Sequence, residues 1–551
     1  MPKINVTSSM EDYFDLNHVI RSEKPNGKDI TTDVALRTFF GRAVHGQETI
    51  YTAPFASEQS TSELLKDWNR TLVSVKRMWP SLYDFEMDLM AKVGPLSVAK
   101  PLRERMSDIG DYFSGILLPR RPIEPWAVWD VLHEWQQAAG LRIRSEAETQ
   151  KRMKMSSNSG APFFDKRRNV VERTGYDIGF SDSSRYPGAV WTRLNTFENL
   201  NCATIGWRGQ EGGIKIDDVK QRVVWMFPYA INLVELGVYQ PLIEAAQKFN
   251  LVPPWVSMEQ VDKHITKLFD TKGSNDVIVC TDFTKFDQHF NRTLQDAAEE
   301  SIDYLFTGDS SLQFWLNKVF PIKYNIPMMY NYGRLWIGEH GMASGSGGTN
   351  ADETLAHRAL QYEVAGLHDA NLNPNSMCLG DDGVLTYPGI TSEDVTRSYS
   401  SHGLEMNKAK QYESKTDCIF LRRWHHQDYR IAGECAGVYS TMRALGRLRY
   451  LERWMNPNVW NERTVALRQL SIIENCKNHP LREQFAEFCM KRDKFRLGKD
   501  IPGFLDNIKQ IAQESIDVMP DFLGYTKSLQ SRDNPAEGID SWWIVKYLKS
   551  V

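Results

Sequence analysis

Four aspartates have the type and spacing that metal-assisted chemistry requires. Asp282 is followed five positions later by Asp287, and Asp381 and Asp382 are adjacent further along the chain. Carboxylate oxygens are the ligands that Mg²⁺ prefers. Two such ions, ~3.5–4 Å apart, can clamp the attacking and leaving oxygens of an in-line displacement. This chemistry is possible only if the fold brings the distant aspartates together.

A predicted strand would carry Asp282. The β-branched run at residues 277–281 is typical of a buried strand that ends just before this aspartate. In an alternative interpretation, Asp282 merely caps the helix suggested by residues 292–304. Asp282 alone does not separate the two interpretations.

A glycine-rich loop that runs into a helix is the second candidate element. The loop reads Ser344-Gly345-Ser346-Gly347-Gly348-Thr349-Asn350, and residues 351–360 have helical spacing of apolar side chains. Its glycines let another chain approach closely, and N–H groups at a helix start suit phosphate. An ordinary surface loop with a helix cap is the alternative. Asp352 and Glu353 need no function, since acids in a first turn complement the helix dipole.

A hairpin is predicted for residues 376–387. Two β-prone runs flank Gly380-Asp381-Asp382-Gly383, which would place the acids at the tip. By itself the tripeptide is weak, because Gly-Asp-Asp occurs by chance in roughly one chain in ten of this length. The order of strand, loop with helix, and hairpin is stronger. These elements suffice for a small antiparallel sheet backed by helices, with Asp282 beside Asp381 if the strand pairs with the hairpin.

Length and composition exclude several classes of protein. With 551 residues, 41% of them hydrophobic, the chain is too long for one compact domain. The net charge of −4 means that any basic surface must be local. Seven cysteines without a C-x-x-C pair argue against a disulfide framework and a zinc ribbon. The N-terminus lacks a signal peptide, and residues 223–243 contain too many polar and proline positions for a membrane helix, so we expect a soluble protein.

Together these patterns resemble a known family. Asp282-x4-Asp287, Ser344-Gly345-x3-Thr349-Asn350 and Gly380-Asp381-Asp382 resemble motifs A, B and C of viral RNA-dependent RNA polymerases. The spellings at residues 282–287 and 379–383 resemble picobirnavirus polymerases most, with the related partitiviruses next. The resemblance covers about residues 150–425. It implies an α+β right-hand polymerase of fingers, palm and thumb, with a ferredoxin-like palm and mostly helical fingers and thumb.

The resemblance also implies a division of the chain. The expected parts are an N-terminal extension that bridges fingers and thumb (1–80), fingers (81–265), palm (266–300), a fingers insertion (301–343), palm (344–425), and thumb with a C-terminal tail (426–551). The aromatic tail at residues 541–547 could offer a stacking platform for initiation or pack against the thumb.

Roles follow from the same resemblance. Asp282, Asp381 and Asp382 would be the catalytic metal ligands. Asp287, Ser344 and Asn350 would read the ribose 2′-OH, and Gly345 and Thr349 would complete this part of the nucleotide site. A reverse transcriptase typically has an aromatic residue at the position of Asp287, so the residue favours ribonucleotides.

Two further motifs follow the hairpin. A helix with N-cap Thr391 should end near Gly403. The segment 404–410 then resembles motif D, which makes Lys410 the candidate general acid for pyrophosphate, with Lys408 as its rival and a solvated lysine as the alternative. Phe420-Leu421-Arg422-Arg423 resembles motif E, the strand pair that grips the primer end, so Arg422 and Arg423 are expected to contact RNA.

Basic residues upstream complete the predicted site. The nucleotide-channel motif F is matched by Arg222, the best candidate for the incoming triphosphate, and by Lys220, Lys215 and Arg208. The template-guiding motif G is matched by Ser159, Gly160 and Pro162, with Lys166 and Arg167 in the adjoining basic patch. A solvated loop is the alternative for this patch.

The sequence therefore predicts an RNA-dependent RNA polymerase that joins NTPs with two Mg²⁺ ions, or Mn²⁺, to replicate and transcribe a viral RNA genome. RNA template and product, NTPs and a capsid protein are the expected partners of a monomer in the virion interior and host cytoplasm, without membrane contact. One alternative is a reverse transcriptase, which Asp287 and Asn350 disfavour. The other is an inactive, palm-like RNA-binding protein, which the presence of all three metal-ligand aspartates disfavours.

Overall fold

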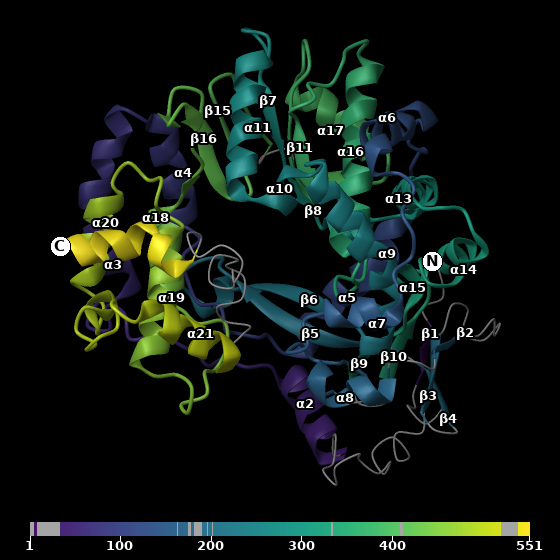
Figure 1. The fold of residues 1–551 in the computed structure, drawn as a ribbon, viewed down its shortest axis with the longest axis horizontal. Helices are drawn as coiled ribbons and strands as arrows, with labels where there is room; N and C mark the ends of the chain where they lie inside the picture. Colours follow the sequence, from purple (N-terminus) through teal and green to yellow (C-terminus); the bar gives the residue numbers. More distant parts are fainter. Residues whose placement is uncertain are drawn as a thin grey trace.

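The computed structural model describes residues 5–7, 33–161, 164–174, 178–180, 190–194, 197–200, 202–331, 334–407, 411–518 and 538–551. Figure 1 shows helices from both ends of the chain, in purple and in yellow-green, gathered on one side of the molecule. Teal and green helices lie on the other side, and some of the strands lie between the two groups. None of the helices in the described ranges is long and apolar enough to cross a membrane.

The central sheet contains the predicted strand and hairpin. Its order is β11 (Met377–Leu379), β12 (Asp382–Leu385), β7 (Ile278–Thr281) and β14 (Tyr412–Ser414), and each neighbouring pair is antiparallel. Strand β7 thus pairs directly with the hairpin, as the sequence predicted. A second, short pairing joins β8 (Phe283–Thr284) to β13 (Glu405–Met406).

Helices cover both faces of this sheet because β7 is apolar on both sides. Ile278 and Cys280 pack in a cluster with α11 (Met258–Thr271), whereas Val279 packs in the main core with α13 (Arg292–Leu305) and α16 (Thr349–Leu367). Successive side chains of a strand point to opposite faces, so a strand covered on both faces is apolar throughout. The core contact between α16 and α6 (Pro125–Trp135) extends the helical layer.

A second sheet carries the basic candidates. Its order is β1 (Asn5–Thr7), β10 (Arg334–Ile337), β9 (Met328–Asn331), β5 (Ala203–Gln210) and β6 (Lys220–Met226). The first part of the glycine-rich stretch 206–213 belongs to β5. Glycine is needed there for close packing, since a Cβ on Gly209 would lie 2.0 Å from the carbonyl oxygen of Leu96.

The two ends of the chain share a hydrophobic core of their own. This cluster joins α3 (Thr61–Leu72) and α4 (Pro80–Met90) to α18 (Thr441–Arg449), α19 (Glu462–Glu474), α20 (Arg482–Met490) and α24 (Trp543–Ser550). The buried Glu86 carboxylate accepts hydrogen bonds from Ser440, Thr441 and Met442 at the start of α18. A carboxylate at a helix N-terminus satisfies free N–H groups and complements the helix dipole.

The aromatic tail packs into this same cluster. Trp542, Ile544 and Leu548 are buried there, and the Glu474 carboxylate accepts the N–H groups of Trp543 and Ile544 at 3.2 and 3.0 Å. The tail therefore takes the packed arrangement of the two that the sequence allowed.

The remaining elements connect these layers. The helices are α2 (Asp33–His45), α5 (Met106–Ser114), α7 (Glu146–Lys151), α8 (Arg167–Thr174), α9 (Tyr229–Lys248), α10 (Pro253–Val256), α12 (Phe286–His289), α14 (Ser310–Lys318), α15 (Ile322–Asn325), α17 (Ser392–Ser400) and α21 (Ile508–Val518). The short strands are β2 (Ile178–Phe180), β3 (Val190–Leu194), β4 (Phe197–Leu200), β15 (Asp417–Phe420), β16 (Arg423–His426), β17 (Arg430–Ile431), β18 (Glu434–Cys435) and β19 (Val438–Tyr439). The predicted N-cap of α17 is present, because the Thr391 side chain accepts the N–H of Asp394.

Candidate active site

The hairpin turn places its two acids differently. Leu379 pairs with Asp382, so the connection consists of Gly380 and Asp381 alone. Gly380 has φ +58°, a left-handed conformation that favours glycine at the first position of a two-residue turn. Asp381 therefore lies at the tip, whereas Asp382 begins β12. The sequence had placed both acids at the tip.

Helix α16 holds this turn through two side chains. The N–H of Gly380 donates to Thr354 Oγ1 at 3.0 Å, and His357 Nδ1 lies 2.8 Å from the Gly380 carbonyl oxygen. Burial lowers the pKa of His357 to about 4. The ring is therefore neutral at physiological pH, and its Nδ1–H is the donor that a carbonyl acceptor requires.

Pairing of β7 with β12 brings Asp282 to the same edge. Gly383 lies opposite Thr281, and Asp382 and Asp282 are the next residues outward on the two chains. The backbone of Asp282 is held on both sides by one amide side chain: its N–H donates to Gln411 Oε1 at 3.2 Å, and its carbonyl oxygen accepts from Gln411 Nε2 at 2.6 Å.

The carboxylates repel one another in a partly desolvated setting. Burial, followed by the charge of Asp287, raises the pKa of Asp381. Burial, followed by the charge of Asp381, raises the pKa of Asp382 to about 7. The charge of Asp282 adds to both shifts. Such mutual destabilisation of negative charge is relieved by a bound cation.

Arg222 is the cation that the second sheet contributes. Its Nη2 lies 3.5 Å from Asp287 Oδ2, and the Asp287 side chain is only 10% exposed. The charge of Asp381 also stabilises the protonated guanidinium of Arg222, which counters the effect of burial and raises its pKa. Two residues predicted to bind the nucleotide, one in motif F and one in motif A, are thus in contact.

The glycine-rich loop lies against β6. The N–H of Trp225 donates to Ser344 Oγ at 3.3 Å, and a Cβ on Gly345 would fall 1.6 Å from the Trp225 carbonyl oxygen. The Thr349 hydroxyl donates to loop carbonyls, while Asn350 is exposed and accepts a 2.7 Å hydrogen bond from the indole N–H of Trp255.

The other motif F candidates lie on β5, on β6 and on the turn between them. Arg208, opposite Arg222 in the β5–β6 register, forms a 3.3 Å ion pair with Glu452. Lys215 is exposed on the turn between the strands, and the exposed Lys220 begins β6.

The motif G candidates Ser159 and Gly160 pack against the start of α9. The Ser159 carbonyl accepts the N–H of Tyr229 at 2.7 Å, and Gly160, with φ +64°, fits against the Phe227 carbonyl, which a Cβ would approach to 2.4 Å. Lys166 is exposed, whereas Arg167 donates to Asn232 at 2.7 Å. Pro162, Lys408 and Lys410 lie outside the described residues.

The motif E candidates form a hairpin. Strands β15 and β16 pair with Phe420 opposite Arg423, which leaves Leu421 and Arg422 as a two-residue turn. The charge of Arg422 reaches Asp382 and lowers its pKa against the effect of burial. Arg423 instead binds the Asp262 carboxylate with two nitrogens, at 2.8 and 3.2 Å.

Comparisons with known proteins agree with this geometry. The family model of viral RNA-dependent RNA polymerases matches residues 140–442. A potential RNA-dependent RNA polymerase of human picobirnavirus is 57% identical over 519 residues, which make up 94% of this chain and 96% of that relative. The chain belongs to the viral RNA-dependent RNA polymerase family.

Solved structures of related polymerases extend the likeness to the fold. The crystal structure of the RNA-dependent RNA polymerase of a human picobirnavirus is 53% identical, has a TM-score of 0.89 and covers 99% of each chain. An insertion-loop deletion mutant is also 53% identical, with a TM-score of 0.87 over 94% of this chain and 97% of that one. The predicted right-hand α+β fold is confirmed.

The family also confirms the predicted activity. This polymerase is an RNA-directed nucleotidyltransferase, and its family copies viral RNA genomes with divalent metal ions by a two-metal mechanism. The alternatives of a reverse transcriptase and an inactive RNA-binding protein gain no support from these relatives.

The polymerase carboxylates have the right chemistry for such ions. Asp282, Asp381 and Asp382 offer only oxygen ligands, which hard divalent cations prefer. In the described part of the chain, however, no three or more His, Cys, Asp or Glu side chains are gathered around a common point. The donor types and the repulsion between the carboxylates fit a divalent cation, but the side chains do not form a closed coordination shell.

Two acids near the start of α16, Asp352 in the first turn and Glu353 directly after it, do more than complement the helix dipole. The fully buried Asp352 accepts hydrogen bonds from Tyr239 at 2.7 Å and Tyr324 at 2.6 Å, and pairs with the equally buried Lys323 at 3.0 Å. The buried Glu353 has a pKa raised far above its usual value, first by burial and then by the charge of Asp287. Sequence reasoning missed both residues.

A signal for Glu353 was present in the sequence. Asn350, Glu353, Thr354 and His357 follow the i, i+3, i+4, i+7 spacing of one helix face. Polar residues in that pattern, directly after the motif B loop, indicate a helix face that points toward the active site.

Proposed function

We propose that this polymerase extends RNA at the edge formed by Asp282, Asp381 and Asp382, with Mg²⁺ as the metal. The observation that carries the proposal is the pairing of β7 with β12, which brings the motif A and motif C aspartates to one edge of one sheet. Asp282 and Asp381 would hold the ions, and Asp382 would assist. Bound ions would stabilise charge on the attacking 3′-oxygen and on the leaving pyrophosphate.

Arg222 and Asp287 would bind the incoming NTP. The guanidinium matches the geometry and charge of a phosphate, and Asp287 can accept a hydrogen bond from the ribose 2′-OH. Their mutual ion pair, at 3.5 Å, is longer than a close charged hydrogen bond. A triphosphate would therefore exchange this weak contact for stronger ones and release Asp287 toward the sugar.

We infer that residues 33–75 bridge fingers and thumb. Phe40 packs in the main core, whereas Leu64, Trp68 and Val75 pack in the cluster that contains α18–α20. Leu82 and Phe85 belong to that cluster too, which supports a thumb-side contact for the first helix of the expected fingers region. The other expected boundaries of fingers, palm and thumb remain predictions.

Partners and location follow by family analogy. We infer that the polymerase binds RNA template, RNA product and NTPs as a monomer, contacts a capsid protein, and acts in the virion interior and host cytoplasm. Light scattering of the purified chain tests the inferred monomeric state. Co-purification with the virus's own capsid protein tests the inferred contact with that protein.

An incorporation assay tests the proposed active site. Asp282→Ala and Asp381→Ala should each abolish extension of a primed RNA template with Mg²⁺ while template affinity stays near that of the wild type, because the ions act on the reaction and not on template binding. Asp84→Ala, at an exposed aspartate of α4, is the matched control. Near-normal extension by either active-site variant would refute the proposal.

A further inference from the structure

The first half of α9 carries two buried polar residues with no assigned role. Asn232 is 3% exposed and Glu235 is fully buried. Both face the motif B loop. The Asn232 amide donates to the Gly345 carbonyl at 3.2 Å, while the Glu235 carboxylate accepts the Ser346 hydroxyl and, at 3.2 Å, the N–H of Gly347.

These contacts contribute to the position of the motif B loop. Glycines provide no side chains that could anchor it, and the loop lies directly on α9. A Cβ on Gly347 would lie 2.9 Å from Leu236, and one on Gly348 would lie 2.2 Å from the Tyr239 ring. Hydrogen bonds from a rigid helix therefore add to the contacts of Ser344 and Thr349 in fixing the loop backbone.

Asn232 and Glu235 are also connected by hydrogen bonds to the basic segment beside motif G. Asn232 Nδ2 also donates to Glu235 at 3.1 Å, and Asn232 Oδ1 accepts from Arg167 Nη2 at 2.7 Å. Every hydrogen-bonding group of the Asn232 amide is thus in use. The result is one continuous polar chain, here called the α9 relay, which runs from Arg167 through Asn232 and Glu235 to Ser346.

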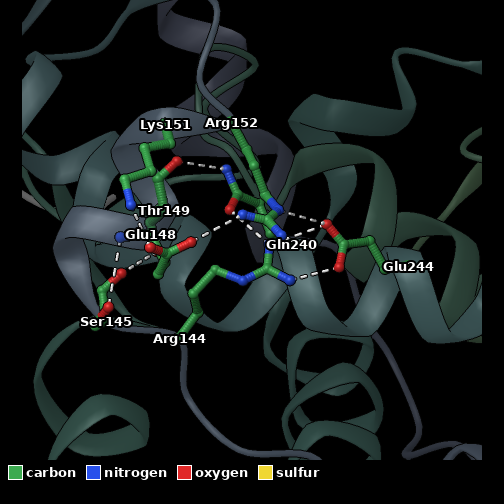
Figure 2. A network of polar contacts seen from close by, with 8 residues as sticks. All are labelled: Arg144, Ser145, Glu148, Thr149, Lys151, Arg152, Gln240 and Glu244. Atoms are coloured by element: carbon green, nitrogen blue, oxygen red, sulfur yellow. Dashed lines mark hydrogen bonds and ion pairs between the residues drawn. The ribbon is translucent and has the colours of Figure 1, made fainter.

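The second half of α9 anchors the other end of the basic segment. In Figure 2, Arg144 and Arg152 reach the Glu244 carboxylate, and Gln240 lies between them. Gln240 also donates to the Thr149 carbonyl at 3.1 Å. Helix α9 therefore holds the chain immediately before and immediately after the segment 153–166, and holds the motif B loop at the same time.

We propose that Asn232 and Glu235 are positioning residues that set the motif B loop relative to the template-guiding segment. The proposal rests on the proposed function and on the role that the family resemblance implies for Ser344 and Asn350, at the two ends of this loop, in reading the ribose 2′-OH. If a hydrogen bond of the α9 relay is lost, the motif B loop shifts and the NTP binds more weakly. The positions of Asp282, Asp381 and Asp382 do not change. The effect should fall on KM and on sugar discrimination and leave kcat largely intact.

Kinetics of three variants test the relay. Asn232→Ala and Glu235→Leu should each raise the KM for NTP and lower the preference for NTP over dNTP by about tenfold, with kcat within about twofold of the wild type. Glu235→Gln retains an acceptor oxygen for the loop and should recover most of the loss. Glu244→Gln weakens the ion pairs with Arg144 and Arg152 and removes no contact with the motif B loop. As the matched control on the same helix, it should leave the KM for NTP and the preference for NTP over dNTP as in the wild type.

A double-mutant cycle tests whether the α9 relay is one continuous chain of hydrogen bonds. Arg167→Ala should add little to Asn232→Ala, because both cut the same chain of hydrogen bonds, and fully additive effects would refute the relay. Equal losses of kcat for NTP and dNTP, with discrimination unchanged, would also overturn the proposal by showing a purely structural role. Should Glu235→Leu fail to fold, the proposal is tested by comparing the KM for NTP and the sugar discrimination of Asn232→Ala with those of Glu235→Gln.

Failure of the relay is distinct from failure of the active site. If Asp381→Ala is inactive while the relay variants match Glu244→Gln, the relay is wrong and the active site stands. If Asp381→Ala still extends primers, the active-site assignment itself is wrong.

Discussion

The ring of His357 lies 2.8 Å, through Nδ1, from the carbonyl oxygen of Gly380, the residue directly before the motif C aspartate Asp381. Thr354, one turn earlier on α16, accepts the N–H of the same glycine at 3.0 Å. Both polar groups of this glycine are therefore bound by one helix. Because α16 begins with the motif B loop, the element that would bind the nucleotide also fixes the metal-binding turn.

Removal of this support should slow the reaction. His357→Gln is expected to lower kcat by about tenfold to a hundredfold, the usual cost of losing a group that orients a metal ligand, with less effect on the KM for NTP. Steady-state primer extension measures both constants. His368→Gln provides a control at the C-cap of the same helix, since the His368 ring also bonds to a carbonyl, that of Val364, at the far end of α16. Equal activity of the two variants would contradict the role of His357.

Sugar choice should depend on Asp287. This carboxylate is buried beside Arg222 at the active site, and Asp287→Ala removes the predicted acceptor for the 2′-OH. The preference for NTP over dNTP should fall by about tenfold to a hundredfold, the cost of one lost charged hydrogen bond. Competition between labelled ATP and dATP on one template measures the ratio, and unchanged discrimination would exclude Asp287 as the sensor.

The sequence predicted the parts of the site that depend on local chemistry. A β-branched run before Asp282 and a glycine turn at Gly380 fix a strand and a hairpin from short-range preferences alone. Short-range preferences do not predict contacts between residues that are far apart in the sequence. Arg423, expected to contact RNA, is bound by Asp262 of a helix far away in the sequence, and no local pattern indicates that partner.

Polar residues inside apolar segments were the main signal that sequence reasoning did not use. Asn232 and Glu235 interrupt the apolar run 223–243, and this interruption argues against a membrane helix. In the fold they hold the motif B loop. A buried polar group needs partners, so such an interruption within a core helix indicates a contact worth seeking.

The motif E turn should store strain at the primer grip. Leu421 and Arg422 both have positive φ, +52° and +60°, in a two-residue hairpin turn that usually contains Asn and Gly. Arg422→Gly should therefore stabilise the protein by about 1 kcal/mol, because a left-handed conformation costs an L-residue roughly that much.

The same substitution should reduce primer binding, since it removes the cation beside Asp382. Urea unfolding gives the stability, and the KM for primed template gives the function. Arg422→Lys keeps both the strain and the charge, so it should match the wild type in stability. A Gly variant that is no more stable than the wild type would show that the turn is relaxed.

Acid should destabilise the fold through His340. This histidine is fully buried, its ring stacks on Trp225 at 4.3 Å, and burial lowers its pKa to about 4. The unfolded chain binds the proton near the ordinary value of 6.5, so between pH 6.5 and 4 the unfolded state holds more protons than the folded one. Stability should therefore be fully present above pH 6.5 and fall as the pH drops toward 4, by on the order of 3 kcal/mol for this residue.

Denaturant titrations at several pH values between 6.5 and 4 measure how the free energy of unfolding changes with pH. His340→Phe keeps an aromatic ring against Trp225 but cannot bind a proton, so its free energy of unfolding should depend less on pH between 6.5 and 4 than that of the wild type. His45→Phe, at an exposed histidine, should retain the wild-type slope. Identical slopes for wild type and His340→Phe would mean that His340 is not the group responsible, and the acid sensitivity would then have to arise from other buried groups of the fold.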